Sequence, residues 1–178
     1  MKILAISGSL RATSSNTAIL RAAARIAPAD VQVAVYDRLQ DIPAFSPDLD
    51  VIFLPEPVAD LRARIAGADA LMISSPEYAH GMPGSLKNLL DWLVSSLEAL
   101  NKPVLLFSAS PGGAAFAHAQ LTEVLNTMNL PVVDAGAHVF SRSKLDVTGE
   151  VTSPALLSYI ADGLAMLIAM ACTTTPAD

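Results

Sequence analysis

Short apolar segments alternate with longer segments of helical periodicity along this chain, and that alternation restricts the folds it can adopt. Five of the apolar runs fit buried strands: Lys2–Ser7, Val31–Tyr36, Ala70–Ser74, Val104–Ser108 and Pro131–Val133. The segments between them carry apolar residues at the three- and four-residue spacing of amphipathic helices. Such alternation is typical of a parallel sheet whose crossover helices cover both faces. The sequence therefore predicts an α/β fold built on one doubly wound, five-stranded sheet.

Helices are expected at Ser14–Ile26, Val58–Ala66, Ala115–Met128 and Pro154–Ala171, with a further one after Pro83. The expected inner face of the first helix consists of Ile19, Leu20, Ala23 and Ala24. After Pro83, apolar residues at helical spacing predict a helix that reaches Leu97; they are Leu86, Leu89, Leu90, Leu93, Val94 and Leu97. The polar residues of the same helix, expected to face away from the core, are Lys87, Asn88 and Asp91. Residues 43–57 are proline-rich, which predicts an irregular connection.

The length and composition of the chain are typical of a single globular domain. The chain has 178 residues, of which 52% are hydrophobic and 16% charged. We expect a single domain over residues 1–178, because one core usually serves ~100–200 residues and this chain has ample apolar surface to bury. The formal charge of −6 argues against a general affinity for nucleic acid.

Cysteine and histidine usage argues against disulfide and metal chemistry. Cys172 is the sole cysteine, and His80, His118 and His138 show no metal-ligand spacing, so no metal site is expected. The apolar run after Lys2 is too short for a secretion signal, and the longest apolar stretch, Leu164–Cys172, is shorter than the ~20 residues that span a bilayer. We therefore expect a cytoplasmic protein without a membrane segment.

Ligands of an open parallel sheet bind beyond the carboxyl ends of its strands, so the loops after the first, third and fourth strands are the candidates. The first, from Ser7 to Thr17, holds six hydroxyl side chains, Asn16 and Arg11 ahead of a helix start. Hydroxyls, free helix-terminal amides and a guanidinium suit a phosphate dianion. The loop matches neither a Walker A sequence nor a Gly-x-Gly-x-x-Gly fingerprint. A plain polar turn with a capping serine remains the alternative.

The other two loops suit the flat part of a ligand. The loop from Ser74 to Asn88 is made rigid by two prolines, and its backbone could line the edge of a heterocycle. An ordinary structured turn, with Tyr78 as a packing residue, is the alternative. In the loop from Ser108 to Ala114, Gly112 and Gly113 allow close approach of the backbone to a ligand, and they also occur in ordinary turns.

Two of these loops carry a resemblance to a known family. The sequence Gly8-Ser9-Leu10-Arg11 with Ser14 and Asn16 resembles the first motif of the NADPH-dependent FMN reductases. Their second motif is similar to Pro76-Glu77-Tyr78, Gly81, Pro83-Gly84, Leu86-Lys87-Asn88 and Asp91-Trp92. The family includes quinone, azo-dye and chromate reductases. The resemblance implies a flavodoxin-like sheet with strand order 2-1-3-4-5 and, in the cell, homodimers or homotetramers.

The resemblance also implies where FMN binds. The phosphate would be held by Ser9, Arg11, Ser14, Ser15, Asn16 and Thr17. The isoalloxazine would be lined by Pro76, Glu77, Tyr78 and Ala79, with Ser108, Gly112 and Gly113 near its other side. Ala79 departs from the family pattern, because many members have Asn there. No catalytic side chain is assigned, since the flavin carries the chemistry; whether His80 donates a proton stays open.

By the same resemblance, NADPH or NADH would pass a hydride to the flavin and leave before a small-molecule oxidant binds, which predicts ping-pong kinetics. The principal alternative is a flavodoxin-like FMN electron carrier without nicotinamide-dependent turnover. A hydrolase is disfavoured because the sequence has no Gly-x-Ser-x-Gly elbow. A scaffold protein that has lost its flavin is disfavoured by the intact phosphate loop.

Overall fold

Five parallel strands form one sheet in the order β2-β1-β3-β4-β5, which is the order that the family resemblance implies. The computed structural model describes residues 1–139, 145–146 and 148–174; the side chains of residues 137–139 and 174, His138 among them, lie outside this description. The strands are β1 (Lys2–Ser7), β2 (Gln32–Tyr36), β3 (Ala70–Ser75), β4 (Val104–Ser110) and β5 (Val132–Val139). Since all run parallel, their carboxyl ends lie along the same edge of the sheet.

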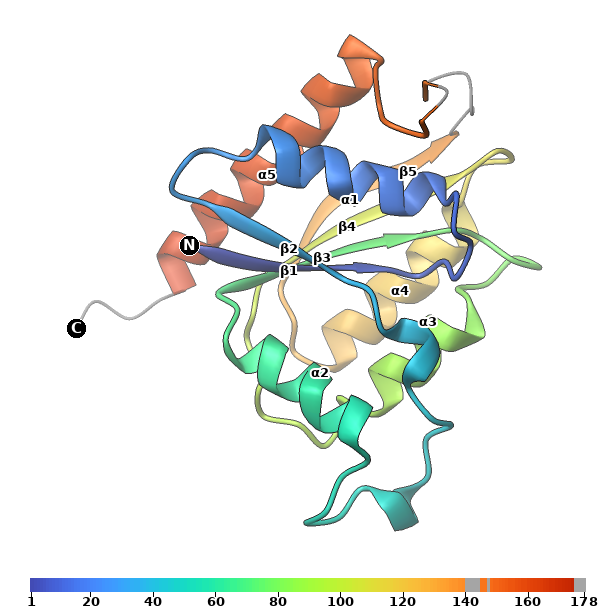
Figure 1. Ribbon diagram of the computed structural model, residues 1–178, viewed down its shortest axis with the longest axis vertical. Coiled ribbons are helices and arrows are strands. Elements are labelled where there is room, and N and C mark those ends of the chain that lie inside the picture. The colour runs from blue at the N-terminus through green and yellow to red at the C-terminus, as the bar shows by residue number, and fades with distance from the viewer. Residues whose placement is uncertain (140–144, 147, 175–178) are drawn as a thin grey trace.

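Helices cover both faces of this sheet (Figure 1). One face carries α1 (Ser15–Ile26) and α5 (Pro154–Thr174), and the other carries α2 (Glu56–Ala66), α3 (Gly84–Asp91) and α4 (Ala115–Thr127). Two short 3-10 turns, η1 (Leu39–Asp41) and η2 (Pro47–Leu49), interrupt the connection between β2 and α2. The predicted doubly wound architecture is confirmed.

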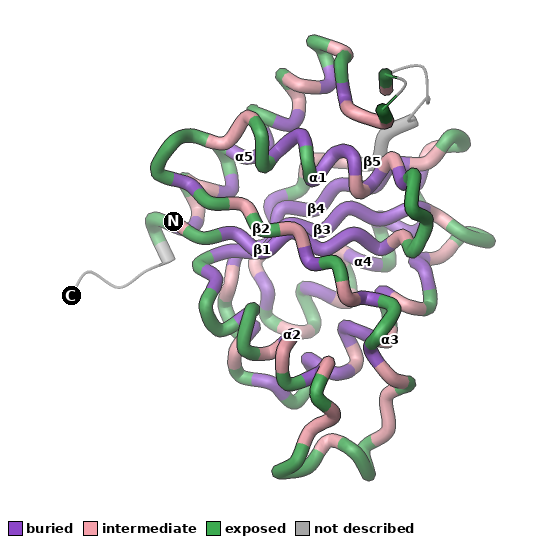
Figure 2. Tube along the Cα trace, viewed as in Figure 1, coloured by how far each residue is buried: buried purple, intermediate pink, exposed green. Residues whose placement is uncertain are grey.

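The two faces of the sheet support separate cores because successive strand residues point to opposite sides. On β1, Leu4 and Ile6 belong to the cluster beneath α2, α3 and α4, whereas Ile3 and Ala5 belong to the cluster beneath α1 and α5. Figure 2 shows the strands at the centre as buried along most of their length. Near-continuous apolar strands of this kind are expected when both faces of a parallel sheet are covered.

The helix after Pro83 is shorter than the sequence predicts. It ends at Asp91, and Val94 and Leu97, expected on its inner face, are 69% and 80% exposed. The chain leaves the helix through tight turns in which Leu93 N donates to Leu90 O. Ser95 and Ser96 follow, and serine favours such turns because its hydroxyl competes for local polar groups. The Ser96 hydroxyl donates to the Glu98 carboxylate, a local contact made outside the helix.

Two expected orientations are also wrong. Asn88 does not face solvent: its carbonyl accepts from Phe45 N at 2.8 Å and its amide donates to Pro43 O at 2.8 Å. These bonds attach the 43–45 segment to α3. On α1, Ala24 is exposed and Ala22 is buried, because α1 contacts both the sheet and α5 and its apolar stripe is rotated accordingly.

The C-terminal helix packs on the sheet along one stripe. Leu156, Ile160, Leu164 and Leu167 are buried against β4 and α1, while the opposite side is exposed. The segment Pro154–Thr173 is long and apolar enough to cross a membrane by length and composition, with 33% of its most apolar window buried. The segment is longer than the uninterrupted apolar stretch Leu164–Cys172 considered in the sequence analysis. Helices in the core of soluble proteins also meet this criterion of length and composition.

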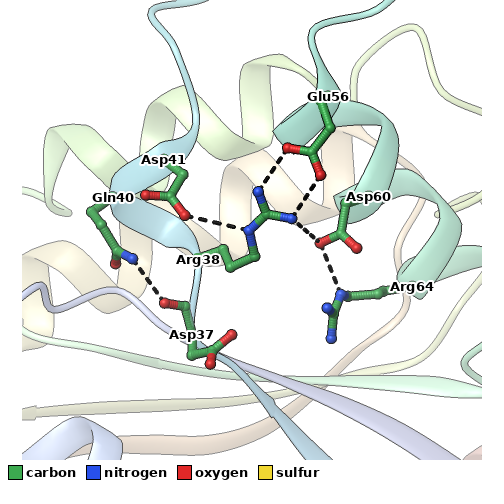
Figure 3. Close-up of polar contacts among 7 residues, drawn as sticks. All are labelled: Asp37, Arg38, Gln40, Asp41, Glu56, Asp60 and Arg64. Atoms are coloured by element: carbon green, nitrogen blue, oxygen red, sulfur yellow. Dashed lines mark hydrogen bonds and ion pairs between the residues drawn. The ribbon is translucent and has the colours of Figure 1, made fainter.

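The connection from β2 to α2 is fastened by charged side chains. Figure 3 shows the Arg38 guanidinium between Glu56 and Asp41: it donates to the two Glu56 oxygens at 2.9 and 2.7 Å and to Asp41 at 3.3 Å. The bond from Arg38 lowers the pKa of Glu56. Further along, Asp50 accepts from Arg62 of α2 at 2.9 Å and from the Ser95 hydroxyl. Between these anchors Ile52 and Phe53 are 92% and 90% exposed.

Asp50→Asn tests the second anchor. The Ser95 hydrogen bond, with the Arg62 charge, lowers the pKa of Asp50 from its ordinary 3.8. A carboxyl of this kind stabilises the fold above its ordinary pKa, and the contribution is lost as the pH falls through the lower folded value. We expect Asp50→Asn to reduce the free energy of unfolding by ~1–2 kcal/mol at pH 7 and by less at pH 3, measured by urea unfolding. Asp48→Asn is the control, and an equal deficit at both pH values would contradict this account.

Candidate functional site

A crevice of about 110 Å³ lies at the carboxyl edge of the sheet, where the loops after β1, β3 and β4 meet. Its lining residues are Ser9, Arg11, Ser14, Ser15, Asn16, Pro76, Glu77, Tyr78, Ala109, Ser110 and Pro111. The first eight are residues that the sequence singles out, and the parallel sheet brings them together from positions some sixty residues apart. A larger cavity of about 280 Å³ lies beyond Ser14, between Arg21 and Asp146. That cavity does not meet the ends of β3 and β4, so the smaller crevice is the better candidate.

The loop after β1 ends in a capped helix start. The Ser14 oxygen accepts from Thr17 N at 3.4 Å, which makes Ser14 the N-cap of α1. The first amides of a helix have no intrahelical acceptor, so those of Ser15 and Asn16 are available at the crevice. The Arg11 side chain is exposed and, among the described residues, forms no ion pair. Together they give a cation, two amides and hydroxyl groups to one anion.

The Asn16 side chain has a structural task in the same loop. Its amide donates to Ala109 O at 3.0 Å, and its carbonyl accepts from the Ser74 hydroxyl at 2.8 Å. Asn16 is 3% exposed, so the start of α1 is joined to the ends of β3 and β4 by two buried hydrogen bonds. Its backbone amide remains available to a ligand. Thr17 is also engaged, donating its hydroxyl to Ser7 at 2.9 Å, and it does not line the crevice.

The loop after β3 is held by the first turns of α4. One Glu77 carboxylate oxygen accepts from Ala117 N at 2.9 Å and so caps a helix whose own N-cap residue, Ala114, has no capping side chain. The Gln120 carbonyl accepts from Met82 N at 2.9 Å. The His80 ring stacks on Phe116, with ring centroids 4.3 Å apart. Three contacts from α4 thus fix the backbone of residues 77–82.

That loop also contains strained backbone. Tyr78 and Gly81 exchange two backbone hydrogen bonds of 2.9 and 3.0 Å, which close a tight turn. Its central residues, Ala79 and His80, have φ values of 48° and 60°. Left-handed conformations are unfavourable for residues with a Cβ, and they persist where surrounding contacts hold them. The turn leaves Tyr78 51% exposed at the crevice rim, whereas Ala79 lies outside its lining.

The end of β4 and the turn after it supply three lining residues that the sequence did not single out. Ala109, Ser110 and Pro111 line the crevice, and Gly112, Gly113 and Ser108 do not. Gly113 has φ 86°, which a turn here requires, and Gly112 is exposed with open space around it. The missed signal is the strand itself: β4 continues two residues past Ser108, and the residues ending a parallel strand face the ligand edge.

The donors fit a phosphate dianion, and the open rim fits a flat ring. The crevice volume is below the ~300 Å³ of sites that enclose a whole ligand, so it suits the polar end of a molecule such as FMN, with the ring lying against residues 76–78 at the surface. Among the residues that the structure describes, no three His, Cys, Asp or Glu side chains gather as metal ligands.

Comparison with known proteins agrees with this geometry. Residues 1–144 match the NADPH-dependent FMN reductase family, and the chain belongs to it. This membership supports FMN as the cofactor and NAD(P)H as its partner nucleotide.

Three relatives illustrate the match. The chain is 37% identical over 122 residues to the NAD(P)H-dependent FMN reductase PA1204 of Pseudomonas aeruginosa, covering 67% of this chain and 65% of the relative. It is 36% identical to the NADH:(hydroxy)cinnamate reductase subunit CrdA of Vibrio ruber, covering 73% and 65%. It is 32% identical to the quinone reductase of Escherichia coli K12, covering 90% and 89%. The match thus spans slightly under two thirds of the length of the first two relatives.

Solved structures agree on the fold. The flavoenzyme FerB of Paracoccus denitrificans, an NAD(P)H:(acceptor) oxidoreductase, superposes with a TM-score of 0.79 at 24% identity, covering 95% of this chain and 98% of FerB. The NADH:FMN oxidoreductase EmoB gives 0.69 at 20% identity, covering 99% and 91%. At these identities the likeness concerns the flavodoxin-like fold alone.

Substitution of Asn16 tests whether its two side-chain hydrogen bonds hold the three loops together. Asn16→Ala leaves the Ser74 hydroxyl and the Ala109 carbonyl without their buried partner, and each loss costs ~1–3 kcal/mol of unfolding free energy. Asn16→Asp keeps the acceptor for Ser74 but places a buried carboxylate oxygen against the Ala109 carbonyl, so a loss at least as large as in Asn16→Ala is expected. Urea unfolding measures both, with Ser15→Ala, at a half-buried neighbouring position, as the control. Wild-type stability of Asn16→Ala would show that these bonds do not brace the crevice.

Proposed function

We propose that this chain is an NAD(P)H-dependent FMN reductase that transfers electrons to quinone-type acceptors. The observation that supports it most directly is the crevice itself, where the Arg11 cation and the first amides of α1 lie beside the Pro76–Tyr78 segment. Family membership and the quinone reductases among its relatives support the same activity. Azo compounds, metal oxyanions and free flavin are further acceptors that an open flavin face would admit.

In this proposal the protein binds both the phosphate and the ring of FMN. Arg11, the hydroxyls of Ser9, Ser14 and Ser15, and the amides of Ser15 and Asn16 hold the phosphate. The rigid Pro76–Tyr78 segment lines the ring, with Ala79 beside it, and the turn that contains Gly112 and Gly113 lies near the opposite edge. When bound, FMN supplies the hydride-transfer chemistry, so no side chain has to act as a nucleophile.

The protein's contribution is orientation and access. The α4 contacts to residues 77–82 fix the wall on which the ring lies, and a fixed wall lowers the entropic cost of aligning two reactants. Because the nicotinamide nucleotide and the acceptor use the same open face in turn, ping-pong kinetics are expected. His80 stacks on Phe116, which supports a structural task for its ring rather than proton transfer. Homodimers or homotetramers and a cytoplasmic location complete the proposal.

The decisive experiment follows the flavin through both half-reactions. The purified protein is expected to show flavin absorbance that bleaches on anaerobic addition of NADPH or NADH and returns on addition of a quinone. Initial rates at several quinone concentrations should give parallel double-reciprocal lines. An FMN electron carrier would hold flavin without a saturable nicotinamide dependence, and a protein that neither contains nor takes up FMN would refute the proposal.

Arg11→Ala tests the phosphate contact. Charge-assisted hydrogen bonds contribute ~1.5–3 kcal/mol, so FMN affinity should fall about ten- to a hundredfold. Stability should hardly change, because the Arg11 side chain is exposed and unpaired among the described residues. Fluorescence titration with FMN and urea unfolding measure the two quantities. Arg21→Ala, which removes an exposed charge from α1 outside the crevice, is the control; FMN affinity equal to wild type in Arg11→Ala would reject the assignment.

A further inference from the structure

A buried histidine bridges α4 to two neighbouring strands, β4 and β5. His118 is 8% exposed; its Nδ1 lies 3.0 Å from the Ser108 hydroxyl of β4, and its Nε2 lies 2.7 Å from Asp134 Oδ1 of β5. Both ring nitrogens are therefore engaged. With one proton on the ring, Nε2 donates to the carboxylate and Nδ1 accepts from Ser108. With two protons, both nitrogens donate, so the same geometry satisfies either state.

The order Ser–His–Asp resembles a hydrolytic triad, but burial excludes that chemistry. Ser108 is 1% exposed and lies within β4, facing α4. A substrate carbonyl cannot reach its oxygen, and Ser108 is not at a strand-to-helix elbow of the kind that presents a nucleophile. The arrangement must serve something other than acyl transfer.

The strands that His118 joins are irregular at this point. Between Leu106 and Ser108 the pairing of β4 with β5 shifts register: Leu106 pairs with Asp134, whereas Ser108 pairs with Ala137. Asp134 Oδ1 also accepts from Gly136 N at 2.6 Å, and Gly136 has φ 86°. His118 thus contacts one residue on each side of a bulge. Bulges of this kind occur beside active sites, where they redirect a strand end.

The α4 residues around His118 face the cofactor loop. Phe116 stacks on His80, Ala117 N donates to Glu77, and Gln120 accepts from Met82 N, all within two positions of His118. We propose that His118 is a positioning residue for the FMN reductase reaction: it fixes α4 against the bulge of β4 and β5, and α4 in turn fixes the loop 77–82, whose Glu77 and Tyr78 line the flavin crevice. This inference rests on the proposed FMN site.

The physical reason is that small displacements matter in such a site. A binding wall has to be held by residues that are themselves locked, because slack of about 1 Å is enough to lose function. Asp134 of β5 contacts the His118 ring directly, whereas Glu77 and His80 of the loop contact its helix neighbours Ala117 and Phe116. On α5, Tyr159 is the titratable group that feels the Asp134 charge. Burial and the Asp134 charge raise the pKa of Tyr159, whose hydroxyl donates to Ala135 O.

Three substitutions of His118 test its contacts to Ser108 and Asp134 separately. His118→Ala removes both contacts, His118→Asn can keep the one to Ser108, and His118→Gln can keep the one to Asp134. We expect His118→Ala to weaken FMN affinity at least about tenfold. The holoprotein is diluted, and the fluorescence of the released FMN measures this loss. The Asn and Gln variants should each recover part of this loss. The visible circular dichroism of the bound flavin should change in all three, because it reports the surroundings of the ring.

Leu125→Ala is the matched control. Leu125 is fully buried on the same helix and takes no part in the bridge, so its truncation destabilises α4 while leaving the contacts to residues 77–82 in place. It should lower the urea midpoint yet keep wild-type FMN retention and dichroism. If His118→Ala does not fold, Asp134→Asn replaces it: its side chain is 59% exposed, and it weakens the bridge from the β5 side.

The outcomes separate the two claims. Wild-type protein that does not bind FMN overturns both the proposed function and this inference. Wild-type protein that binds FMN, with His118 and Asp134 variants that retain it and keep the wild-type dichroism, overturns the inference alone. FMN loss that merely follows the loss of stability, equally in Leu125→Ala and the His118 variants, also overturns it.

Discussion

The two buried hydrogen bonds of the Asn16 side chain are the interaction on which the site depends. They hold the start of α1 against Ser74 at the end of β3 and Ala109 at the end of β4. A backbone bond from Gly8 N to Ser74 O, 2.8 Å long, already joins the loop after β1 to β3, and the Asn16 side chain extends this link to the end of β4. Because both Asn16 bonds are shielded from water, they fix the distance between the anion-binding amides and the ring-lining segment rather than adding a loose surface contact.

A second group of contacts approaches the same crevice from the other face of the sheet. The helix α4 lacks a capping side chain of its own and takes one from Glu77 of the loop. The cap stabilises the helix and the helix immobilises the loop, so each supports the other. This mutual support explains how Ala79 and His80 remain in left-handed conformations, which cost of order 1–3 kcal/mol each. Backbone strain in a turn beside the crevice indicates that the shape of this loop is important for ligand binding.

Packing overrode local pattern where the sequence reading failed. The spacing of Val94 and Leu97 fits a continued helix, yet turns at Leu93 and the following serines end it, and both side chains are exposed. Asn88 is polar and was expected in solvent, but it satisfies backbone groups of the 43–45 segment. Neither outcome can be read from periodicity, because each depends on a partner more than forty residues away or on local hydrogen bonds that compete with the helix.

Apolar periodicity was enough to predict the layers of the fold and the three loops that meet at the carboxyl edge of the sheet, because parallel strands make those loops neighbours. The family resemblance supplied the strand order and most of the residues that line the crevice. Tertiary structure decided how each side chain is used. It assigned Asn16 to bracing, Glu77 to capping α4 and Ser108 to a buried contact with His118, and it added Ala109, Ser110 and Pro111 to the lining. Hydrogen-bond partners distant in the chain leave no trace in local pattern, since their meeting depends on how helices and strands pack in space.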